Sequence, residues 1–496
     1  MNRSKFPPGA SVLGLLAIVG TLALAGFVSV LPTFKNVQTI ASTPGAQSSG
    51  GAAAGTGSGG GNPAAPGAAA GTGTGTGAGA AAGTGAGAGA AAAAGGGKTG
   101  ATAATGCDVS HNGGKTDTGV SATAISLAST VAESGIGESF LGEVRYGMTA
   151  VTNSVNTSGG ICGRQLDLKL VDDGWDRDRG ANDIRSFIDE GAFALPVVPS
   201  SEGLNEASNG QVIDRAAIPV VGTDGMLKSQ YSDPWIWPVA TSTVSTAHIA
   251  ASSAYHSGAR TFGIVYDSNY KFGPEGNAAF ADAIGHLSGA TLAVSVGVTA
   301  GQSDYSSDGS TFNNKCNPCD MVFVLMDPTT AESWFATSGA NGAKMFTEGP
   351  QPLFVYTFGQ NCGAPCNNMI VWTSYYPPRP PFTSRKAVAA YVNAIKGVSD
   401  SADVDNQFLE GGYDGMLLFV DALRKVGPDL TRARLRDVLN TTSFDSGLSQ
   451  PLTWSAGNHA ANISMLGFTD QYSGGFNDFQ YAQTGWVTDP WPTLDR

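Results

Sequence analysis

The stretch that decides the fold is FALPVVPSSEGLNEASNGQVIDRAAIPVVGTDG, residues 193–225. It opens with the apolar run Phe193–Val198 and closes with a second apolar run, Ile218–Val221. Both runs are apolar at consecutive positions rather than at alternating ones, which is typical of strands covered on both faces. We therefore predict two buried strands that belong to a parallel sheet.

The same alternation of short apolar runs and helical stretches continues on both sides of this stretch, from Gly119 onward. The other predicted strands are Ala124–Ala128, Leu166–Val171, Phe262–Tyr266, Met321–Met326, Leu353–Tyr356 and Met369–Trp372. Apolar residues recur at helical spacing in two segments, Phe140, Leu141, Val144, Met148, Val151 and Val155, and Met416, Leu417, Val420, Leu423 and Val426. This pattern predicts α/β architecture with doubly wound lobes and mainly parallel sheets.

The segment before this region has a different composition. The chain has 496 residues and 69 glycines, and residues 44–106 are almost entirely Gly, Ala, Thr and Ser. Such a tract buries no core of its own, so we interpret residues 33–118 as a low-complexity tether. At this composition about 75 residues span roughly 45–50 Å.

The N-terminus carries an export signal. Arg3 and Lys5 precede the apolar run Ala10–Leu31, which is long enough to cross a bilayer as one helix. We predict a short cytoplasmic end at residues 1–9 and a transmembrane anchor at residues 10–32. A signal peptide cleaved after Ala23-Leu24-Ala25 is the alternative, although the apolar run continues beyond that point. The binding domain is thus expected outside the cytoplasm, anchored in the cell membrane or secreted after cleavage.

Charge and cysteines agree with an exported protein that does not bind nucleic acid. Lys and Arg number 27 against 40 Asp and Glu, for a net charge of -13. The six cysteines form an even set, which outside the cytoplasm favours disulfides: Cys107, Cys162, Cys316, Cys319, Cys362 and Cys366. We pair Cys107 with Cys162 first. The other four have zinc-like spacing, but disulfides are the simpler interpretation.

The residues that follow the predicted strands are the candidates for a binding site, because ligands of such sheets bind beyond the carboxyl ends of the strands. These positions are rich in hydroxyls, carboxylates and aromatic rings: Ser200, Ser201, Thr223, Asp224, Gly225, Tyr270 and Asp327. They favour reversible recognition of a small polar solute by hydrogen bonds. The same side chains are good helix caps, so capping is the alternative role.

The sequence lacks the patterns of a catalytic or metal site. The five histidines show no HxxxH or HExxH spacing, and no G-x-S-x-G elbow occurs. The acidic run Asp172–Asp178 resembles a calcium loop, but the twelfth position counted from Asp176 is Phe187 instead of Glu. We predict neither enzymatic activity nor a cofactor, and we interpret the acidic run as a turn that caps a helix.

Several motifs in fixed order resemble a known family. They are Gly119-Val120 leading to Thr130-x-x-x-Ser134-Gly135, Asn156-x-x-Gly159-Gly160-Ile161-Cys162-Gly163-Arg164, Val171-Asp172-Asp173-Gly174-x-Asp176, Ile218-Pro219-Val220-Val221, Gly273-Pro274-Glu275-Gly276, Gly411-Gly412-Tyr413-Asp414 and Pro451-Leu452-Thr453-Trp454. From about Gly119 to the C-terminus the chain resembles the leucine/isoleucine/valine-type periplasmic binding proteins, the type I solute-binding proteins of ABC transporters.

The resemblance implies two α/β lobes that close on a ligand and are joined by three crossovers. It places lobe 1 at residues 119–241 and 377–450, and lobe 2 at residues 242–376 and 451–496. The crossovers are expected near Val239–Ser245, Thr373–Pro378 and Leu448–Trp454.

The resemblance also implies roles for single residues. In the family, first-lobe hydroxyls hold the ligand carboxylate, and these map onto Ser200 and the turn Thr223–Gly225; Phe408 falls at an apolar ligand contact. Asp224 departs from the family pattern and repels a carboxylate. The second-lobe acid that holds an ammonium is missing, and Asp327 is the candidate to replace it.

The expected function is therefore capture of a small polar or amphipathic solute, such as an amino acid or a related amide or carboxylate, for delivery to an ABC permease. A ligand sensor read by a partner protein is the alternative. We also expect Ser200 and Thr223 to contribute to binding, and Asp172 and Asp173 to folding alone.

Overall fold

The computed structural model describes residues 107–473 and 475–494. The predicted anchor at residues 10–32 and the tether up to residue 106 lie outside the described residues. Within the described ranges, no helix is both long enough and apolar enough to cross a membrane.

The first lobe is built on parallel strands. Strand β1 pairs with β2, and β3, β4 and β5 pair with one another in that order, all in parallel. A bridge from Leu127 to Ala194 links β1 to β3. The strands are β1 (Ala124–Val131), β2 (Gln165–Asp172), β3 (Leu195–Pro196), β4 (Val220–Val221) and β5 (Ile236–Trp237).

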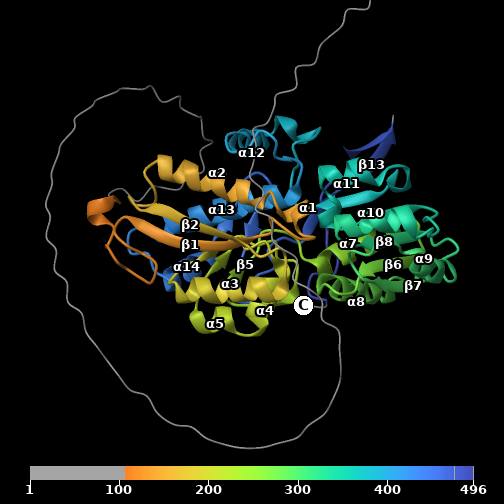
Figure 1. The fold of residues 1–496 in the computed structure, drawn as a ribbon, viewed down its shortest axis with the longest axis horizontal. Coiled ribbons are helices and arrows are strands. Elements are labelled where there is room, and N and C mark those ends of the chain that lie inside the picture. Colours follow the sequence, from red (N-terminus) through yellow and green to blue (C-terminus); the bar gives the residue numbers. More distant parts are fainter. Residues whose placement is uncertain (1–106, 474, 495–496) are drawn as a thin grey trace, which may run out of the picture. The chain divides into compact units, whose positions relative to one another are not determined.

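Helices cover both faces of these strands, with α2 on one side of β1 and β2 and α3, α4 and α5 on the other (Figure 1). A Cβ atom on Gly147 would lie 2.6 Å from the backbone nitrogen of Tyr413, so α2 and α13 pack backbone to backbone. The helices of this lobe are α1 (Glu138–Leu141), α2 (Val144–Thr157), α3 (Arg177–Asp189), α4 (Ser201–Asn209), α5 (Val212–Ala216), α6 (Lys228–Ser232), α12 (Lys386–Lys396), α13 (Gln407–Val426) and α14 (Arg432–Leu439).

The second lobe is built on one mixed sheet. Its order is β14-β13-β10-β9-β8-β6-β7; the strands from β7 to β10 run parallel, and β13 runs antiparallel to both of its neighbours. The strands are β6 (Thr261–Asp267), β7 (Thr291–Val298), β8 (Met321–Leu325), β9 (Phe346–Gly349), β10 (Ile370–Thr373), β13 (Ser464–Ser473), β14 (Phe476–Tyr481) and β15 (Val487–Thr488), which pairs with β13. Every residue of β8 is buried, as its unbroken apolar sequence predicts.

Helices flank this sheet, with α10 and α11 on one side of the strands and α8 on the other (Figure 1). They are α7 (Thr243–His256), α8 (Phe272–Gly285), α9 (Ser306–Asn313), α10 (Pro328–Thr337) and α11 (Tyr356–Cys362). Short 3₁₀ helices occupy Val109–His111, Gln351–Leu353, Ala364–Cys366 and Phe382–Ser384. The α/β architecture with mainly parallel sheets is thus confirmed.

One predicted strand is wrong. Leu353–Tyr356 is the end of a 3₁₀ turn followed by the start of α11, and the strand of this region is β9, Phe346–Gly349. Pro350 and Pro352 donate no backbone hydrogen bond, which keeps this segment out of a sheet interior. The apolar run is still buried, because Phe354 stacks on Phe479 with ring centroids 4.9 Å apart.

The chain passes between the lobes three times, and the three crossovers touch one another. The backbone nitrogen of Thr241 donates to Ser374 Oγ at 3.0 Å, and that of Tyr376 donates to Leu448 O at 2.7 Å. The third crossover carries the antiparallel pair β11 (Ser443–Phe444) and β12 (Leu452–Thr453). The crossovers therefore form one hydrogen-bonded hinge.

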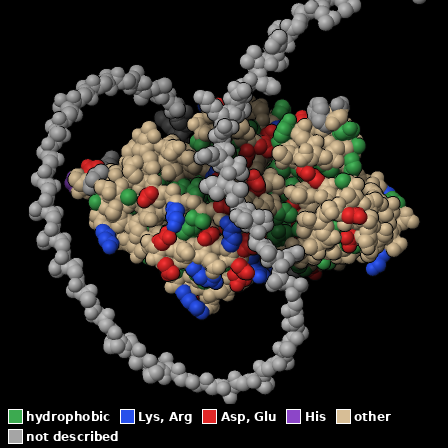
Figure 2. Space-filling view, viewed as in Figure 1, with side chains coloured by type: hydrophobic (Ala, Val, Ile, Leu, Met, Phe, Trp, Pro, Cys, Tyr) green, Lys and Arg blue, Asp and Glu red, His purple; other side chains and the backbone are tan. Residues whose placement is uncertain are grey.

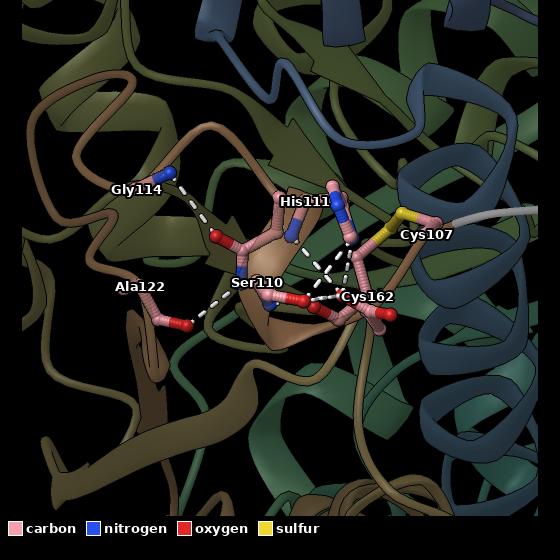
Figure 3. Close-up of polar contacts among 8 residues, drawn as sticks. Cys107, Ser110, His111, Gly114, Ala122 and Cys162 are labelled. Atoms are coloured by element: carbon pink, nitrogen blue, oxygen red, sulfur yellow. Dashed lines mark hydrogen bonds and ion pairs between the residues drawn. A yellow bond between two sulfur atoms is a disulfide. The ribbon is translucent and has the colours of Figure 1, made fainter.

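The first described residues are fastened to lobe 1. Cys107 is joined to Cys162, and Asn112 Nδ2 donates to Ala122 O and Cys162 O at 2.7 and 3.0 Å (Figure 3). Residues 107–118, which we assigned to the tether, thus lie against the domain. The other two disulfides, Cys316–Cys319 and Cys362–Cys366, close short loops of lobe 2.

A candidate ligand-binding cleft between the lobes

Ser200 is the N-cap residue of α4 and Ser201 its first residue, shortly after β3, and both are fully buried. The Ser200 hydroxyl does not cap the helix; it donates to Asp173 Oδ1 at 2.6 Å. Thr223 follows β4, and its hydroxyl donates to Val198 O at 3.0 Å. The two predicted hydroxyls therefore lie at the carboxyl ends of adjacent strands, and each already has an acceptor in the protein.

Asp173 lies beside Ser200, although the sequence predicts a role in folding alone for it. It is fully buried, and its Oδ1 also accepts from the backbone nitrogen of Trp175 at 2.9 Å. Burial raises the pKa of Asp173 to about 6, although the hydrogen bonds from Ser200 and Trp175 act in the opposite direction. The Asp173 carboxylate thus fixes the direction of the Ser200 hydroxyl.

Asp172 has the predicted role of a turn-stabilising residue. Its Oδ1 accepts from the backbone nitrogens of Glu133 and Gly174, and its Oδ2 accepts from Ser134 Oγ. The following helix α3 is capped by Asp176, whose Oδ1 accepts from the backbone nitrogen of Arg179.

An aromatic cluster spans the two lobes beside these residues. The Trp175 indole of lobe 1 stacks on Tyr270 of lobe 2 with centroids 4.3 Å apart, and Phe140 meets Trp175 edge-on at 5.0 Å. Phe408, the predicted apolar contact, lies 5.5 Å from Phe140. Trp175 Nε1 also donates to Ser201 Oγ at 3.3 Å. The cluster therefore brings Ser201, Tyr270 and Phe408 together.

Sequence reasoning did not single out Trp175. The signal was present, because Asp172 to Trp175 follow the strand Leu166–Val171 as Ser200 follows Phe193–Val198. Applying the strand-end rule to this strand as well would have found both Asp173 and Trp175.

Two glutamates hold the lobes together through backbone contacts. Glu202 of α4 accepts from the backbone nitrogen of Lys271, and Glu275 of α8 accepts from that of Lys228, both at 2.7 Å. Burial raises the pKa of Glu202 to about 7 and also raises that of Glu275. Together with the stack of Trp175 on Tyr270, these hydrogen bonds hold the two lobes against each other.

Asp224 lines a small cavity where the first turn of α13 meets the ends of β3 and β4. The cavity measures about 20 Å³, room for about one water molecule, and its wall includes Val144, Val197, Asp224, Tyr375 and Phe408. Burial raises the pKa of Asp224 to about 7. Gly225 turns the chain at a φ of +69°, and a Cβ there would lie 2.3 Å from Pro238.

Asp327 lies apart from the first-lobe residues and serves mainly within lobe 2. Its Oδ1 caps α10 by accepting from the backbone nitrogen of Thr330, and its own backbone nitrogen donates to Asp267 Oδ2 at 2.8 Å. Burial and the charge of Asp327 raise the pKa of Asp267 well above its usual value. Both carboxyls are fully buried, close enough to Tyr270 to raise its pKa further.

The outer part of the cleft is acidic. A hollow of about 660 Å³ is bordered by α1, the start of α2, the loop at Gly301 and the first turns of α10 and α11. It carries the acids Glu138, Glu143 and Asp403 with one cation, Arg145. Figure 2 shows acidic side chains at the surface between the two groups of elements. Within the described residues, no three His, Cys, Asp or Glu side chains are grouped as a metal site.

Comparison with known proteins agrees with this geometry. Residues 124–469 match the family of periplasmic binding proteins. No curated protein matches the chain.

Solved structures share the fold at low sequence identity. A leucine binding protein from Thermotoga maritima has a TM-score of 0.61 and 16% identity, covering 73% of this chain and 98% of that one. A fatty acid ABC transporter substrate-binding protein from Thermomonospora curvata has a TM-score of 0.63 and 17% identity, covering 74% of this chain and 94% of that one. A solute binding protein from R. palustris in complex with benzoate has a TM-score of 0.61 and 15% identity, covering 74% of this chain and 97% of that one.

The two α/β lobes, the three crossovers and the match over residues 124–469 lead to one conclusion: this chain belongs to the periplasmic binding protein family, with the type I fold.

Proposed function

We propose that this protein is an extracytoplasmic receptor that captures a small polar or amphipathic solute between its lobes and delivers it to an ABC permease. The observation that carries the proposal is the cleft itself, where buried hydroxyls and carboxyls at the ends of β3 and β4 meet the rings of Trp175, Tyr270 and Phe408. Polar groups that fix orientation beside apolar walls are the usual composition of a small-molecule site.

The proposed boundaries put residues 119–241 and 377–450 in lobe 1 and residues 242–376 and 451–496 in lobe 2. Members of this family bind small molecules for ABC transporters and are generally not enzymes, and their binding domain is extracytoplasmic. In this chain Ser200, Ser201, Thr223, Asp224, Gly225, Tyr270, Asp327 and Phe408 are the proposed ligand contacts. An amino acid or a related amide or carboxylate is the proposed ligand class.

The experiment that tests capture is a fluorescence titration of the purified protein with leucine, benzoate, a short fatty acid and small amides. A ligand that enters the cleft must disturb the stack of Trp175 on Tyr270, so indole emission should change on binding. The change should vanish in Trp175→Phe and persist in Trp334→Phe, a buried indole on α10 outside the cleft. An unaltered signal in Trp175→Phe would place the binding event elsewhere.

We further propose that residues 10–32 anchor the receptor in the cell membrane. The apolar run beyond Ala25 supports an uncleaved anchor over a signal peptide. The protein should then stay in the membrane fraction until detergent is added. A mature protein whose intact mass begins near Gly26 would instead be secreted.

A sensor read by a partner protein is the second candidate. It is favoured only by the general ability of two closing lobes to report a ligand. Permease and ATPase genes beside this gene would support transport, whereas a kinase gene there would support sensing.

A further inference from the structure

The hydroxyls that would be expected to hold a ligand carboxylate have no hydrogen left to donate to one. A hydroxyl carries one donor and two acceptor lone pairs. The Ser200 hydrogen is directed at Asp173 Oδ1 at 2.6 Å, and the Thr223 hydrogen at Val198 O at 3.0 Å. Each oxygen can therefore only accept from a ligand.

The nearby cavity also presents buried polar atoms without partners. Asp224 is 9% exposed and Tyr375 is 1% exposed, and both line the cavity of about 20 Å³. Among the described residues, neither Asp224 Oδ2 nor the Tyr375 hydroxyl has a hydrogen-bond partner. Buried polar atoms without partners are rare and costly, so these two call for a partner that the described chain does not supply.

The titratable groups around the cavity are acids and a phenol, with no basic side chain in its wall. Glu410 and Asp414 of α13 lie near Tyr375, and together with Asp224 they raise the pKa of its phenol beyond the effect of burial. A carboxylate placed here would compete with the ionisation of these acids, whereas a cation would favour it.

We propose that the end of the ligand that enters this site is a primary ammonium with no carboxylate on the adjacent carbon. An ammonium head is about the size of one water molecule, and Asp224 Oδ2 and the Tyr375 hydroxyl oxygen can accept two of its three donors. Phe408, Val144 and Val197 form the apolar wall for the carbon beside it. This assignment rests on the proposed receptor function and names its ligand class.

The test is calorimetric titration of the whole protein with three matched probes. Leucinamide carries the ammonium without a carboxylate, leucine carries both, and 4-methylpentanamide carries neither charge. Butylamine and putrescine are two further amine probes. Butyrate is the matched carboxylate, and butanol is the matched neutral probe. We expect an amine to bind at least about 10-fold more tightly than its matched carboxylate or neutral probe.

Variants locate the effect. Asp224→Asn should weaken amine binding at least about 10-fold, and Tyr375→Phe should weaken it by a smaller factor. Asp233→Asn is the matched control, because Asp233 is a buried aspartate of lobe 1 that bonds to Ser208 and Trp235 and does not line the cavity. If Asp224→Asn does not fold, Tyr375→Phe carries the test.

The outcomes separate this assignment from the receptor function. Tight binding of a carboxylate or a neutral solute with no amine preference, or amine binding that is equal in Asp224→Asn, Tyr375→Phe and wild type, overturns the ammonium site and leaves a receptor. If none of the amines, carboxylates, amides and alcohols binds, both proposals fall.

Discussion

Replacing Gly415 by alanine should damage both stability and the cleft. Gly415 lies within α13 where this helix crosses the end of β4, and a Cβ there would be 2.2 Å from the carbonyl oxygen of Gly222. Gly222 has a φ of +86°, and its own Cβ would lie 2.4 Å from the Gly415 Cα. The contact is backbone against backbone, so no side-chain rotation relieves it.

The magnitude follows from two opposing effects. Alanine in a helix interior is favoured over glycine by about 1 kcal/mol. Ordinary van der Waals contact begins near 3.4 Å, so α13 must move from β4 by about 1.2 Å. Overpacking of this kind typically costs about 1–3 kcal/mol, and a contact between two backbones falls at the upper end. We expect Gly415→Ala to lose about 1–2 kcal/mol of unfolding free energy.

Urea denaturation measures the loss, with Gly285→Ala as the matched control. Gly285 ends α8, and a Cβ there would meet nothing within 4 Å, so this variant should be neutral or slightly more stable. Gly222 directly precedes Thr223, so the displacement of α13 from β4 should also lower the affinity for whichever ligand the wild type binds. A Gly415→Ala protein as stable as Gly285→Ala would refute the close crossing of α13 and β4.

Three further predictions concern buried side chains. Burial raises the pKa of Glu348 to about 8, only partly offset by the hydrogen bond from Trp372, so its ionisation disfavours the folded state and wild-type stability should fall as pH rises from 4.5 to 8. The free energy of unfolding of Glu348→Gln, measured by urea titration, should rise relative to that of the wild type by about 2–5 kcal/mol across that pH window. A difference between the two proteins that does not change with pH would contradict the assignment. Trp175→Ala removes the ring contacts of the indole and should lower the free energy of unfolding by about 3 kcal/mol or more. The lobes should also open, which solution scattering would detect as a larger radius of gyration. An unchanged radius would show that the indole does not hold the lobes together. Asp173→Ala should weaken ligand binding about as much as Ser200→Ala, whereas unchanged affinity would restore a purely structural role for Asp173.

The sequence predicts the lobes well where the apolar pattern has one interpretation. Strands such as Met321–Leu325 are apolar at every position because helices cover both faces, and no other short element needs that pattern so strictly. The run Leu353–Tyr356 looks the same in sequence, but it is buried as a turn between two prolines and α11. Local pattern alone does not separate the two cases.

The site is less predictable because its chemistry depends on contacts between distant segments. The sequence places Ser200 and Thr223 at strand ends, but only the fold shows where their hydrogens go. Trp175 adopts a φ of +61° that its residue type does not favour, and its partner Tyr270 lies in the other lobe. Such pairs are set by how the lobes close, which periodicity does not encode.

The interleaving of the lobes also orders the events of biosynthesis. Strand β10 is flanked by β9 and by β13; β10 ends at Thr373, and β13 begins only at Ser464. Until that segment leaves the ribosome, one edge of β10 has no strand to pair with, and lobe 1 likewise waits for α13 and α14. Because α14 ends at Leu439 and β13 begins at Ser464, lobe 1 receives its last helix before lobe 2 receives the strand that covers β10. The lobe that begins second in the sequence is therefore also the one completed last.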